Sequence, residues 1–249
     1  MVHMMIEPDI FSPYPNLRAL QTTRHGGISR EPFASLNLGH NTGDNPENID
    51  RNRRILCDRA EISHSSLVTA DQVHGTEVLH ARRGGHYSGY DAFITDSPGL
   101  YLCILTADCF PVLVYDRERN AVGAAHAGWQ GSAANVAGKT LSAMREAFGT
   151  KPSSCLAWIG TGISAAAYEV GKEVASRFES RHAHKNPSGT YQLDLCSINR
   201  DQLEQSGIAD TAIAVSPFCT ARNNRDFYSY RKENGNTGRM ISLIGITAP

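Results

Sequence analysis

The chain has 249 residues, of which 41% are hydrophobic and 20% are charged, and its formal net charge is −1 with a pI near 6.8. This composition is that of an ordinary globular protein and excludes a disordered or fibrous one. Because the chain has no overall basic field, neither nucleic acid nor an anionic membrane surface is expected as its main partner. Small molecules are the expected ligands, and a single domain over residues 1–249 is the expected organisation.

Several features of the sequence favour a cytoplasmic protein. Residues 1–8 contain no cationic segment followed by an apolar stretch, and no later run is long and apolar enough to span a bilayer. The six cysteines lack CxxC spacing, and a chain of this length folds without disulfides. We therefore expect a protein of the reducing cytoplasm.

The predicted elements mix hairpins with strand-to-helix units. In chain order they are a helix at 46–60, strands at 100–105, 111–115 and 121–125, a helix at 130–148, a strand at 155–159, a helix at 168–180, a strand at 191–195, a helix at 197–205, and strands at 212–215 and 240–246. Pro46 suits a first helical turn behind Asn45 or Asp44, and Gly149 is a natural helix stop. This order disfavours a purely parallel sheet and predicts an α+β fold with a mixed sheet or sandwich.

The most informative segment, Leu105 to His126, predicts a β-hairpin. Two apolar runs flank a polar turn at 117–120. A symmetric turn places Pro111 opposite His126, with Cys109 two residues further along on the same face. Backbones of such diagonal neighbours lie roughly 7–8 Å apart, within reach of a common small ion. A turn with a shifted register would place Cys109 directly opposite His126.

Cys109, His126 and a third donor, His74, form a candidate metal site. Thiolate and imidazole are borderline-soft ligands that suit zinc or copper, and three protein ligands leave one coordination position open. His74 is the best third donor because it ends a short apolar run and precedes Gly75. The glycine-rich segment 128–131 lets the backbone approach closely. Singly, a buried Cys or His is more often structural; together the three predict an open, catalytic metal centre.

Eight short blocks extend this hypothesis to a known family. They are Thr23-Arg24-His25-Gly26-Gly27-Ile28-Ser29, Ser35-Leu36-Asn37-Leu38, Gly43-Asp44-Asn45-Pro46-Glu47-Asn48, Gln72-Val73-His74-Gly75, Leu105-Thr106-Ala107-Asp108-Cys109, His126-Ala127-Gly128-Trp129, Tyr168-Glu169-Val170-Gly171 and Phe227-Tyr228-Ser229-Tyr230-Arg231. In this order they resemble the YfiH/laccase-domain family, also called the purine nucleoside phosphorylase or polyphenol oxidase family, over about residues 20–245.

The resemblance implies a single α+β domain in which helices flank a central mixed β-sandwich, and a zinc site whose ligands are His74, Cys109 and His126. It also implies phosphorolysis of adenosine, inosine, guanosine and methylthioadenosine, together with deamination of adenosine. The expected partners are therefore purine nucleosides and phosphate. Zinc with an open position lowers the pKa of bound water toward neutrality, which would supply the nucleophile for attack on C6 of adenosine.

The chain departs from the usual family pattern at three positions. Gln130 stands where an arginine commonly follows the tryptophan, Thr161 where a proline is usual, and Lys232 where a second arginine often occurs. Glutamine cannot make the charged bidentate contact of an arginine, so no anion clamp is expected at position 130. The metal ligands are unaffected.

Further residues are candidates for roles around the metal. Asp108 adjoins a ligand and is the candidate for proton transfer or for orienting the ligand shell, with a loop-capping carboxylate as the alternative. Phosphorolysis requires cationic donors beneath the sugar, and Arg24 and Arg231 lead these candidates, ahead of Lys232 and Arg239.

The sequence leaves two residues with open roles and the site with three alternative functions. His25 and Asn37 contact the substrate or brace loops. The same ligands would hold Cu²⁺ in a phenol oxidase, although paired His-x-His segments are absent. Cys109 with His126 as base would suit a cysteine amidase that edits peptidoglycan precursors. A closed structural zinc site would need a fourth ligand such as Cys103. The H-x-E and P-C-x-x-C pattern of zinc-dependent base deaminases is absent.

Overall fold

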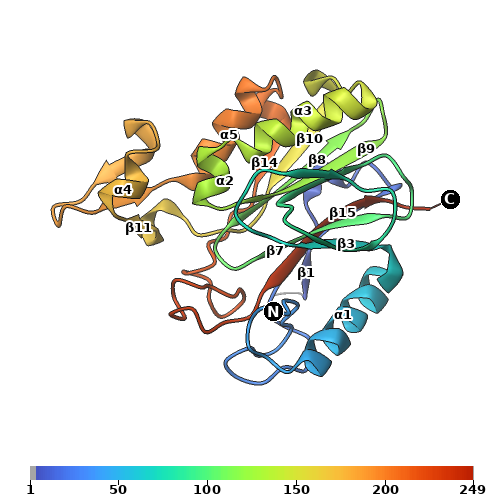
Figure 1. Cartoon of the computed structure of the whole chain (residues 1–249), viewed down its shortest axis with the longest axis horizontal. Helices are drawn as coiled ribbons and strands as arrows, with labels where there is room; N and C mark the ends of the chain where they lie inside the picture. Colours follow the sequence, from blue (N-terminus) through green and yellow to red (C-terminus); the bar gives the residue numbers. More distant parts are fainter. Residues whose placement is uncertain (1–3, 249) are drawn as a thin grey trace.

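The computed structural model describes residues 4–248 and has two six-stranded sheets at its centre (Figure 1). The first sheet has the order β1 (Met5–Ile6), β2 (Leu17–Thr22), β15 (Met240–Ile246), β7 (Tyr101–Thr106), β3 (Leu67–Asp71) and β5 (Gly85–Ser88). The second has the order β14 (Ile213–Val215), β10 (Cys155–Ile159), β8 (Phe110–Asp116), β9 (Ala121–Ala127), β6 (Ala92–Thr95) and β4 (Val78–His80). Both sheets contain parallel and antiparallel pairs. The predicted α+β fold with a mixed sandwich is confirmed.

Helices cover the outer faces of the two sheets. The α-helices are α1 (Pro46–Ala60), α2 (Trp129–Ala133), α3 (Val136–Phe148), α4 (Lys172–Ala175) and α5 (Leu195–Gln205). Short 3-10 helices occupy Asp9–Phe11, His64–Ser66, Pro152–Ser154, Ala165–Ala167, Ser180–His182 and Asp210–Ala212. Helix α1 lies under the first sheet, whereas α3 and α5 lie over the second (Figure 1). Within residues 4–248, no helix combines the length and apolarity that crossing a membrane requires.

Alternate residues of the central strands belong to different cores. Side chains that point inward pack between the two sheets, namely Leu102, Ile104, Leu113, Val122 and Ala124. Their outward neighbours pack against helices, with Cys103 against α1 and Val112 and Val114 against α3. Because both faces of these strands are covered, their sequences are continuous apolar runs.

Two predicted helix boundaries, the beginning of α1 and the end of α3, lie where capping signals place them. Asn45 is the N-cap of α1 and accepts the N–H of Glu47, with Pro46 in the first turn. Gly149 ends α3 in the left-handed conformation, with φ 70°. The predicted helix 130–148 is interrupted, however. Asn135 adopts φ 60° and caps α3, so α2 and α3 are separate helices.

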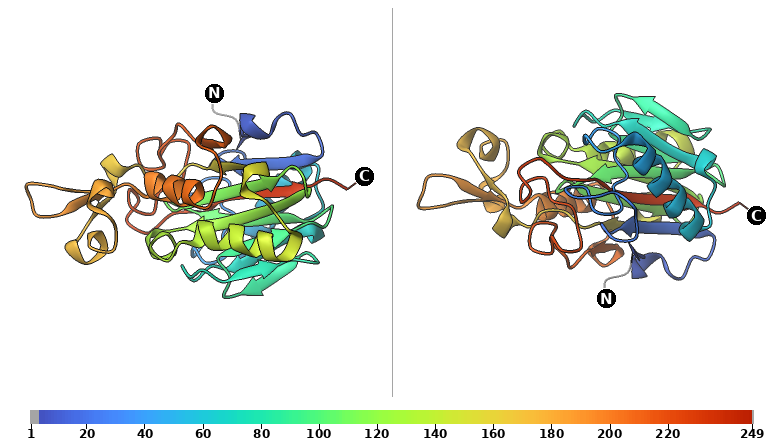
Figure 2. Two further views of the ribbon diagram at one scale, coloured as in Figure 1. Left: turned by 90° about the horizontal axis from the view of Figure 1, so that it is seen from above. Right: turned by 90° about the horizontal axis from the view of Figure 1, so that it is seen from below.

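The prediction of a helix over 168–180 is wrong. Within this range only α4 is α-helical, and β11 (Glu169–Val170) pairs with β13 (Tyr191–Leu193), which also pairs with β12 (Ala183–Lys185). These strands and α4 form a projection from the sandwich, residues 168–194, that we call the arm (Figure 2). The strand predicted at 191–195 is shorter than expected because the Asp194 side chain caps α5, which begins at Leu195.

Candidate metal centre

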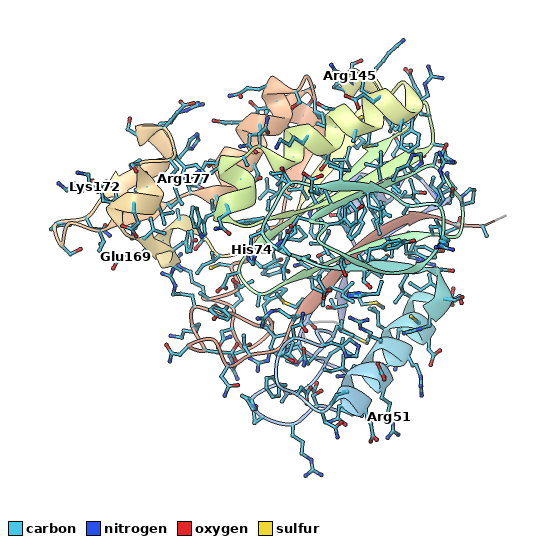
Figure 3. The ribbon with its side chains drawn as sticks, in the orientation of Figure 1. Arg51, His74, Arg145, Glu169, Lys172 and Arg177 are labelled. Atoms are coloured by element: carbon cyan, nitrogen blue, oxygen red, sulfur yellow. The ribbon has the colours of Figure 1, made fainter. Side chains whose placement is uncertain are left out.

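Three side chains that are far apart in the sequence converge beside the arm. His74 follows β3, Cys109 lies in the turn between β7 and β8, and His126 belongs to β9. Their ligand atoms all lie within 4.8 Å of one another. Figure 3 shows His74 where the arm, α2 and the strand ends approach each other. The predicted convergence of two imidazoles and one thiol is therefore present.

The hairpin register explains how Cys109 reaches His126. Strands β8 and β9 pair so that Pro111 lies opposite His126, as the symmetric turn predicted. Cys109 then precedes Pro111 by two residues and lies diagonally from His126 on the same face. The alternative register, with Cys109 directly opposite His126, is wrong.

Asp91, which the sequence analysis did not identify, holds two of the ligands in place. This fully buried residue directly precedes β6, and its Oδ1 lies 2.8 Å from Nδ1 of His126. The same carboxylate accepts the backbone N–H groups of Val73, His74 and Gly75. Burial opposes its ionisation, but the hydrogen bond from His126 and the backbone donors hold its pKa below the ordinary value. Since an ionised carboxylate only accepts, Nδ1 of His126 carries a proton, and Nε2 is the ring nitrogen left to bind a metal. Burial lowers the pKa of His126, but the charge of Cys109 and the hydrogen bond to Asp91 raise it to about 9, so Nε2 must release its proton when a metal binds.

Cys109 is held in the form that binds metals. Burial alone would raise the pKa of its thiol, but the imidazole of His126, with a smaller contribution from His74, lowers this pKa to about 6. A cysteine with this pKa is a thiolate at neutral pH, and the thiolate is the ligand and nucleophile form.

The surroundings of the three ligands fit a metal ion. A Cβ atom at Gly128 would lie 3.0 Å from both Sγ of Cys109 and Cδ2 of His74, so only glycine leaves the space open. Within residues 4–248, the metal-type cluster contains these three ligands and no fourth. Cys103, the alternative fourth ligand, is fully buried against α1 and its thiol faces the carbonyl of Tyr101. A closed site completed by Cys103 is therefore wrong.

All three ligands border one cavity, and two of them also border a second, smaller one. The larger has a volume of about 900 Å³ and lies along the strand ends. The smaller, of about 170 Å³, reaches His74 and Cys109 from the side of Trp129 and Tyr168. Besides the three ligands, the larger cavity is lined by Asp108, Trp129, Tyr168, Tyr230 and the arginines Arg53, Arg231 and Arg239. A cavity of this size, with aromatic walls and a few convergent polar groups, is typical of a small-molecule site.

Asp108 is buried beside Cys109, and its carboxylate already accepts three hydrogen bonds. Oδ1 accepts from the hydroxyls of Thr220 at 2.6 Å and Ser229 at 2.7 Å, and Oδ2 accepts the N–H of Arg231 at 2.6 Å. The residue has φ 89°, so its backbone turns sharply at this point. These contacts tie the turn that carries Cys109 to the C-terminal loop, which favours an orienting and loop-capping role over proton transfer.

Arg231 lines the larger cavity at its border with the arm. Its Nη1 donates to the carbonyl of Glu169 at 2.6 Å, and its guanidinium carbon lies 5.0 Å from the ring centre of Tyr168. On the other side of the arm, the guanidinium of Arg177 lies over the ring of Trp129 at 5.9 Å. The arm is thus joined to both the C-terminal loop and α2, and Figure 3 shows Glu169 and Arg177 on the arm.

Arg24 does not line either cavity. Its Nη1 forms an ion pair with Glu233 at 3.0 Å and donates to the carbonyl of Asn224, while Nε donates to the carbonyl of Ala34. The expected phosphate contact does not fit this position, because the guanidinium is occupied by a carboxylate and two carbonyls. Arg24 instead joins the N-terminal loop to the C-terminal loop.

His25 and Asn37 also lie outside the two cavity walls. Nε2 of His25 is 3.0 Å from a carboxylate oxygen of Asp226. Asn37 is fully buried, and its amide donates to Thr42 while its oxygen accepts the N–H of Arg239. Of the two roles that the sequence left open for His25 and Asn37, these contacts favour the bracing of loops.

Together, the fold and the site define an α+β sandwich protein with a His–Cys–His group at the edge of a ligand-sized cavity. The family model described as multi-copper polyphenol oxidoreductase laccase matches residues 18–247. The chain therefore belongs to this laccase-like family, to which the YfiH proteins also belong. The resemblance that the eight sequence blocks predicted is confirmed.

The alignments with two named relatives and one solved structure extend over nearly the whole chain. A purine nucleoside phosphorylase of Deinococcus radiodurans is 39% identical over 228 residues, which are 90% of this chain and 87% of that protein. The purine nucleoside phosphorylase YfiH of Escherichia coli strain K12 is 37% identical over 240 residues, which are 93% of this chain and 95% of that protein. The crystal structure of YfiH from Bacillus licheniformis superposes with a TM-score of 0.94 at 31% identity, covering 99% of this chain and 97% of that one.

Proposed function

We propose that this protein is a metal-dependent purine nucleoside phosphorylase that also deaminates adenosine. Its substrates would be adenosine, inosine, guanosine and methylthioadenosine, with phosphate as the second substrate. One observation carries the proposal: the ligand atoms of His74, Cys109 and His126 converge on the wall of a 900 Å³ cavity, in a chain whose relatives are named purine nucleoside phosphorylases.

His74, Cys109 and His126 would hold the metal, with zinc as the expected ion and copper as the alternative. When bound, such an ion supplies Lewis acidity at an open coordination position. Asp91 keeps Nδ1 of His126 protonated, so that Nε2 faces the other ligands. Asp91 also fixes the backbone of His74 through its N–H group. One carboxylate thereby orients a ligand on strand β9 and a ligand in the loop after β3.

Aromatic side chains around the ligands would bind the purine base. Trp129 and Tyr168 line both cavities, and Tyr230 lines the larger one. A purine offers two flat π-faces, and its stacking on an aromatic ring contributes roughly 1–3 kcal/mol per base. Arg231 holds the ring of Tyr168 through a cation–π contact. We propose that Arg231 contributes to substrate binding in this way and that Asp108 keeps the loop of Arg231 against the turn of Cys109.

The direct test is product analysis by chromatography after incubation with adenosine, with and without phosphate. We expect free adenine only when phosphate is present, and inosine under both conditions. His74→Ala should abolish both products, whereas His184→Ala, which alters an exposed histidine of the arm, should leave them unchanged. Adenosine that stays intact with the zinc-loaded native protein would refute the proposal.

The Cys109–His126 pair supports a second candidate function, that of a cysteine amidase. A thiolate beside an imidazole is the minimum for nucleophilic catalysis on an amide. Such an enzyme would retain activity after chelation and lose it on alkylation of the thiol. The metal-dependent reaction would instead stop when the metal is chelated and would recover when zinc is added.

The family description supports copper-dependent phenol oxidation as a further candidate. Residues 4–248 contain one cluster of three metal-type side chains, and it has the mixed imidazole and thiolate donors that bind either ion. Metal analysis of protein purified without added copper discriminates between the two. Zinc in a one-to-one ratio, with no oxidation of phenols after copper loading, would support the nucleoside reaction.

A further inference from the structure

We propose that Arg53 and Arg239 form a binding site for a phosphate-class oxyanion in the larger cavity. This inference deepens the proposed function, since phosphorolysis needs phosphate in the same cavity as the nucleoside. It assigns that role to two arginines other than the pair that the sequence indicated. The anion site itself depends only on the contacts of these two side chains.

Neither guanidinium has a carboxylate partner in the part of the chain that the structure describes. Nε of Arg53 donates to the carbonyl of Leu38 at 3.0 Å, and Nη1 of Arg239 donates to the carbonyls of Thr237 and Gly238. The remaining N–H groups of both residues have no protein acceptor within residues 4–248, and both residues line the cavity. A guanidinium without a counter-ion is a ready donor for an oxyanion.

The backbone at residues 38 and 39 positions both arginines. The carbonyl of Leu38 accepts from Arg53, and its N–H donates to the carbonyl of Arg239 at 3.0 Å. The aliphatic part of the Arg239 side chain packs on Gly39, and a Cβ atom at Gly39 would lie only 2.6 Å from Cγ of Arg239. Because residues 38 and 39 contact both arginines, this one short segment determines how both side chains approach the cavity wall. Preorganised donors lose less conformational entropy when they bind an anion.

The electrostatic environment favours an anion at this place. Burial lowers the pKa of both arginines, which means that their charges are poorly solvated and gain from a negative partner. The two carboxylates on the cavity wall already have partners of their own. Asp71 lies 3.2 Å from His86, and Asp108 accepts three hydrogen bonds from loop residues. Within residues 4–248 neither of them forms an ion pair with Arg53 or Arg239, although the charge of Asp108 does act on Arg239 from a distance.

Arg239 connects this site to the metal ligands. The charges of Cys109 and Asp108 act on its guanidinium, which places it within electrostatic range of the centre. Its guanidinium carbon also lies 5.5 Å from the ring centre of Tyr230, so an aromatic wall adjoins the anion site. A phosphate held here would share the cavity with a nucleoside stacked on that wall.

The proposed reaction balances with phosphate at this site. An oxygen of dihydrogen phosphate forms a bond to C1′ of the ribose while the bond between C1′ and N9 of the purine breaks. The electron pair leaves with the purine, which takes one proton from the phosphate. The products are ribose 1-phosphate and the free base. Two guanidinium groups would hold the attacking dihydrogen phosphate in place while positive charge develops at C1′.

The test is calorimetric titration of the full-length, zinc-loaded protein with inorganic phosphate, with and without inosine. We expect Arg53→Gln and Arg239→Gln each to weaken phosphate binding by about tenfold or more, as loss of a charge-assisted contact predicts. Arg53→Lys should restore part of the affinity. The matched control is Arg51→Gln, because Arg51 extends from the same helix into solvent (Figure 3) and should not alter binding. Thermal unfolding verifies that each variant is folded.

A second titration with adenosine 5′-monophosphate distinguishes the source of the phosphate group. Phosphate binding that persists with saturating adenosine identifies free phosphate as the ligand. Binding of the monophosphate that exceeds that of phosphate and depends on Arg53 identifies a phosphate ester. Either result supports the oxyanion site. Binding of neither anion, binding that is the same in both glutamine variants as in the native protein, or loss of binding only in Arg24→Gln or Arg231→Gln would overturn it.

The outcomes separate this inference from the proposed function. If the protein binds phosphate in an Arg53-dependent way but leaves adenosine intact, the proposed function is refuted and the oxyanion site is supported. If Arg53→Gln and Arg239→Gln both carry out phosphorolysis with the native rate and the native KM for phosphate, the oxyanion site is refuted and the proposed function is supported.

Discussion

The two walls of the larger cavity are built differently. The strand wall carries His126 on β9, with Asp91 behind it, and these residues are 3% and 0% exposed. The loop wall carries Tyr168 in the arm and Tyr230 in the C-terminal loop, and Tyr230 is 54% exposed. The groups that must keep fixed distances lie on a paired strand, as His126 does, or directly beside strand ends, as Cys109 and Asp91 do, whereas the aromatic groups proposed to meet the substrate lie in the arm and the C-terminal loop. We therefore expect the strand wall to determine metal binding and the loop wall to determine substrate affinity.

The largest effect should follow removal of a ligand. Cys109→Ala eliminates one of three metal ligands, so we expect metal content to fall below about a tenth of the native level and activity to fall more than roughly 100-fold. Metal content is measured by mass spectrometry of the purified protein. Cys196→Ala, a free cysteine outside the two cavity walls, is the matched control. Native metal content in Cys109→Ala would contradict the assignment of this ligand.

Asp91→Asn should have the next largest effect. The amide cannot accept from His126 and from the three backbone N–H groups as the carboxylate does, so the orientation of two ligands is weakened. We expect metal affinity to fall about 10–100-fold, measured by competition with a chelator. Asp96→Asn, at the exposed far end of β6, should bind metal as the native protein does. Equal affinities in the two variants would show that Asp91 does not position the ligands.

Tyr168→Ala tests whether the two walls act independently. Loss of the ring should raise KM for adenosine about 5- to 100-fold, as expected for a stacking contact, with metal content unchanged. Tyr168→Phe keeps the ring and should preserve KM. The measurement is steady-state kinetics combined with metal analysis. If Tyr168→Ala also loses its metal, the comparison between the walls does not hold.

Arg231→Gln should have the smallest effect. It removes the cation–π contact with Tyr168 and the hydrogen bond to Glu169, which together anchor the arm. We expect KM to rise about two- to fivefold, in line with a cation–π contact at an exposed position. Kinetics of Lys232→Gln, which alters the exposed neighbouring cation, provide the baseline. A loss greater than that of Tyr168→Ala would point to direct contact between Arg231 and the substrate.

The same contrast explains where sequence-based prediction succeeded. In the β7–β8–β9 region both strand faces are buried, so short apolar runs and a polar turn were sufficient to predict the hairpin and its register. In the arm, residues 168–180 follow a helical pattern, but pairing of β11 with β13 overrides it. Pairing with a strand about twenty residues away is a tertiary interaction, and no local pattern indicated it.

The candidate site divides in the same way. The donor chemistry of His74, Cys109 and His126, the hairpin that joins two of them and the capping of α1 followed from residue types and spacing. Asp91, the occupation of Arg24 by Glu233 and the exposure of Arg53 and Arg239 to the cavity followed only from the tertiary structure. A ligand is marked by its own chemistry, which the sequence contains. Whether a charged side chain has a partner depends on which distant segment packs against it, and that is decided only when the chain folds.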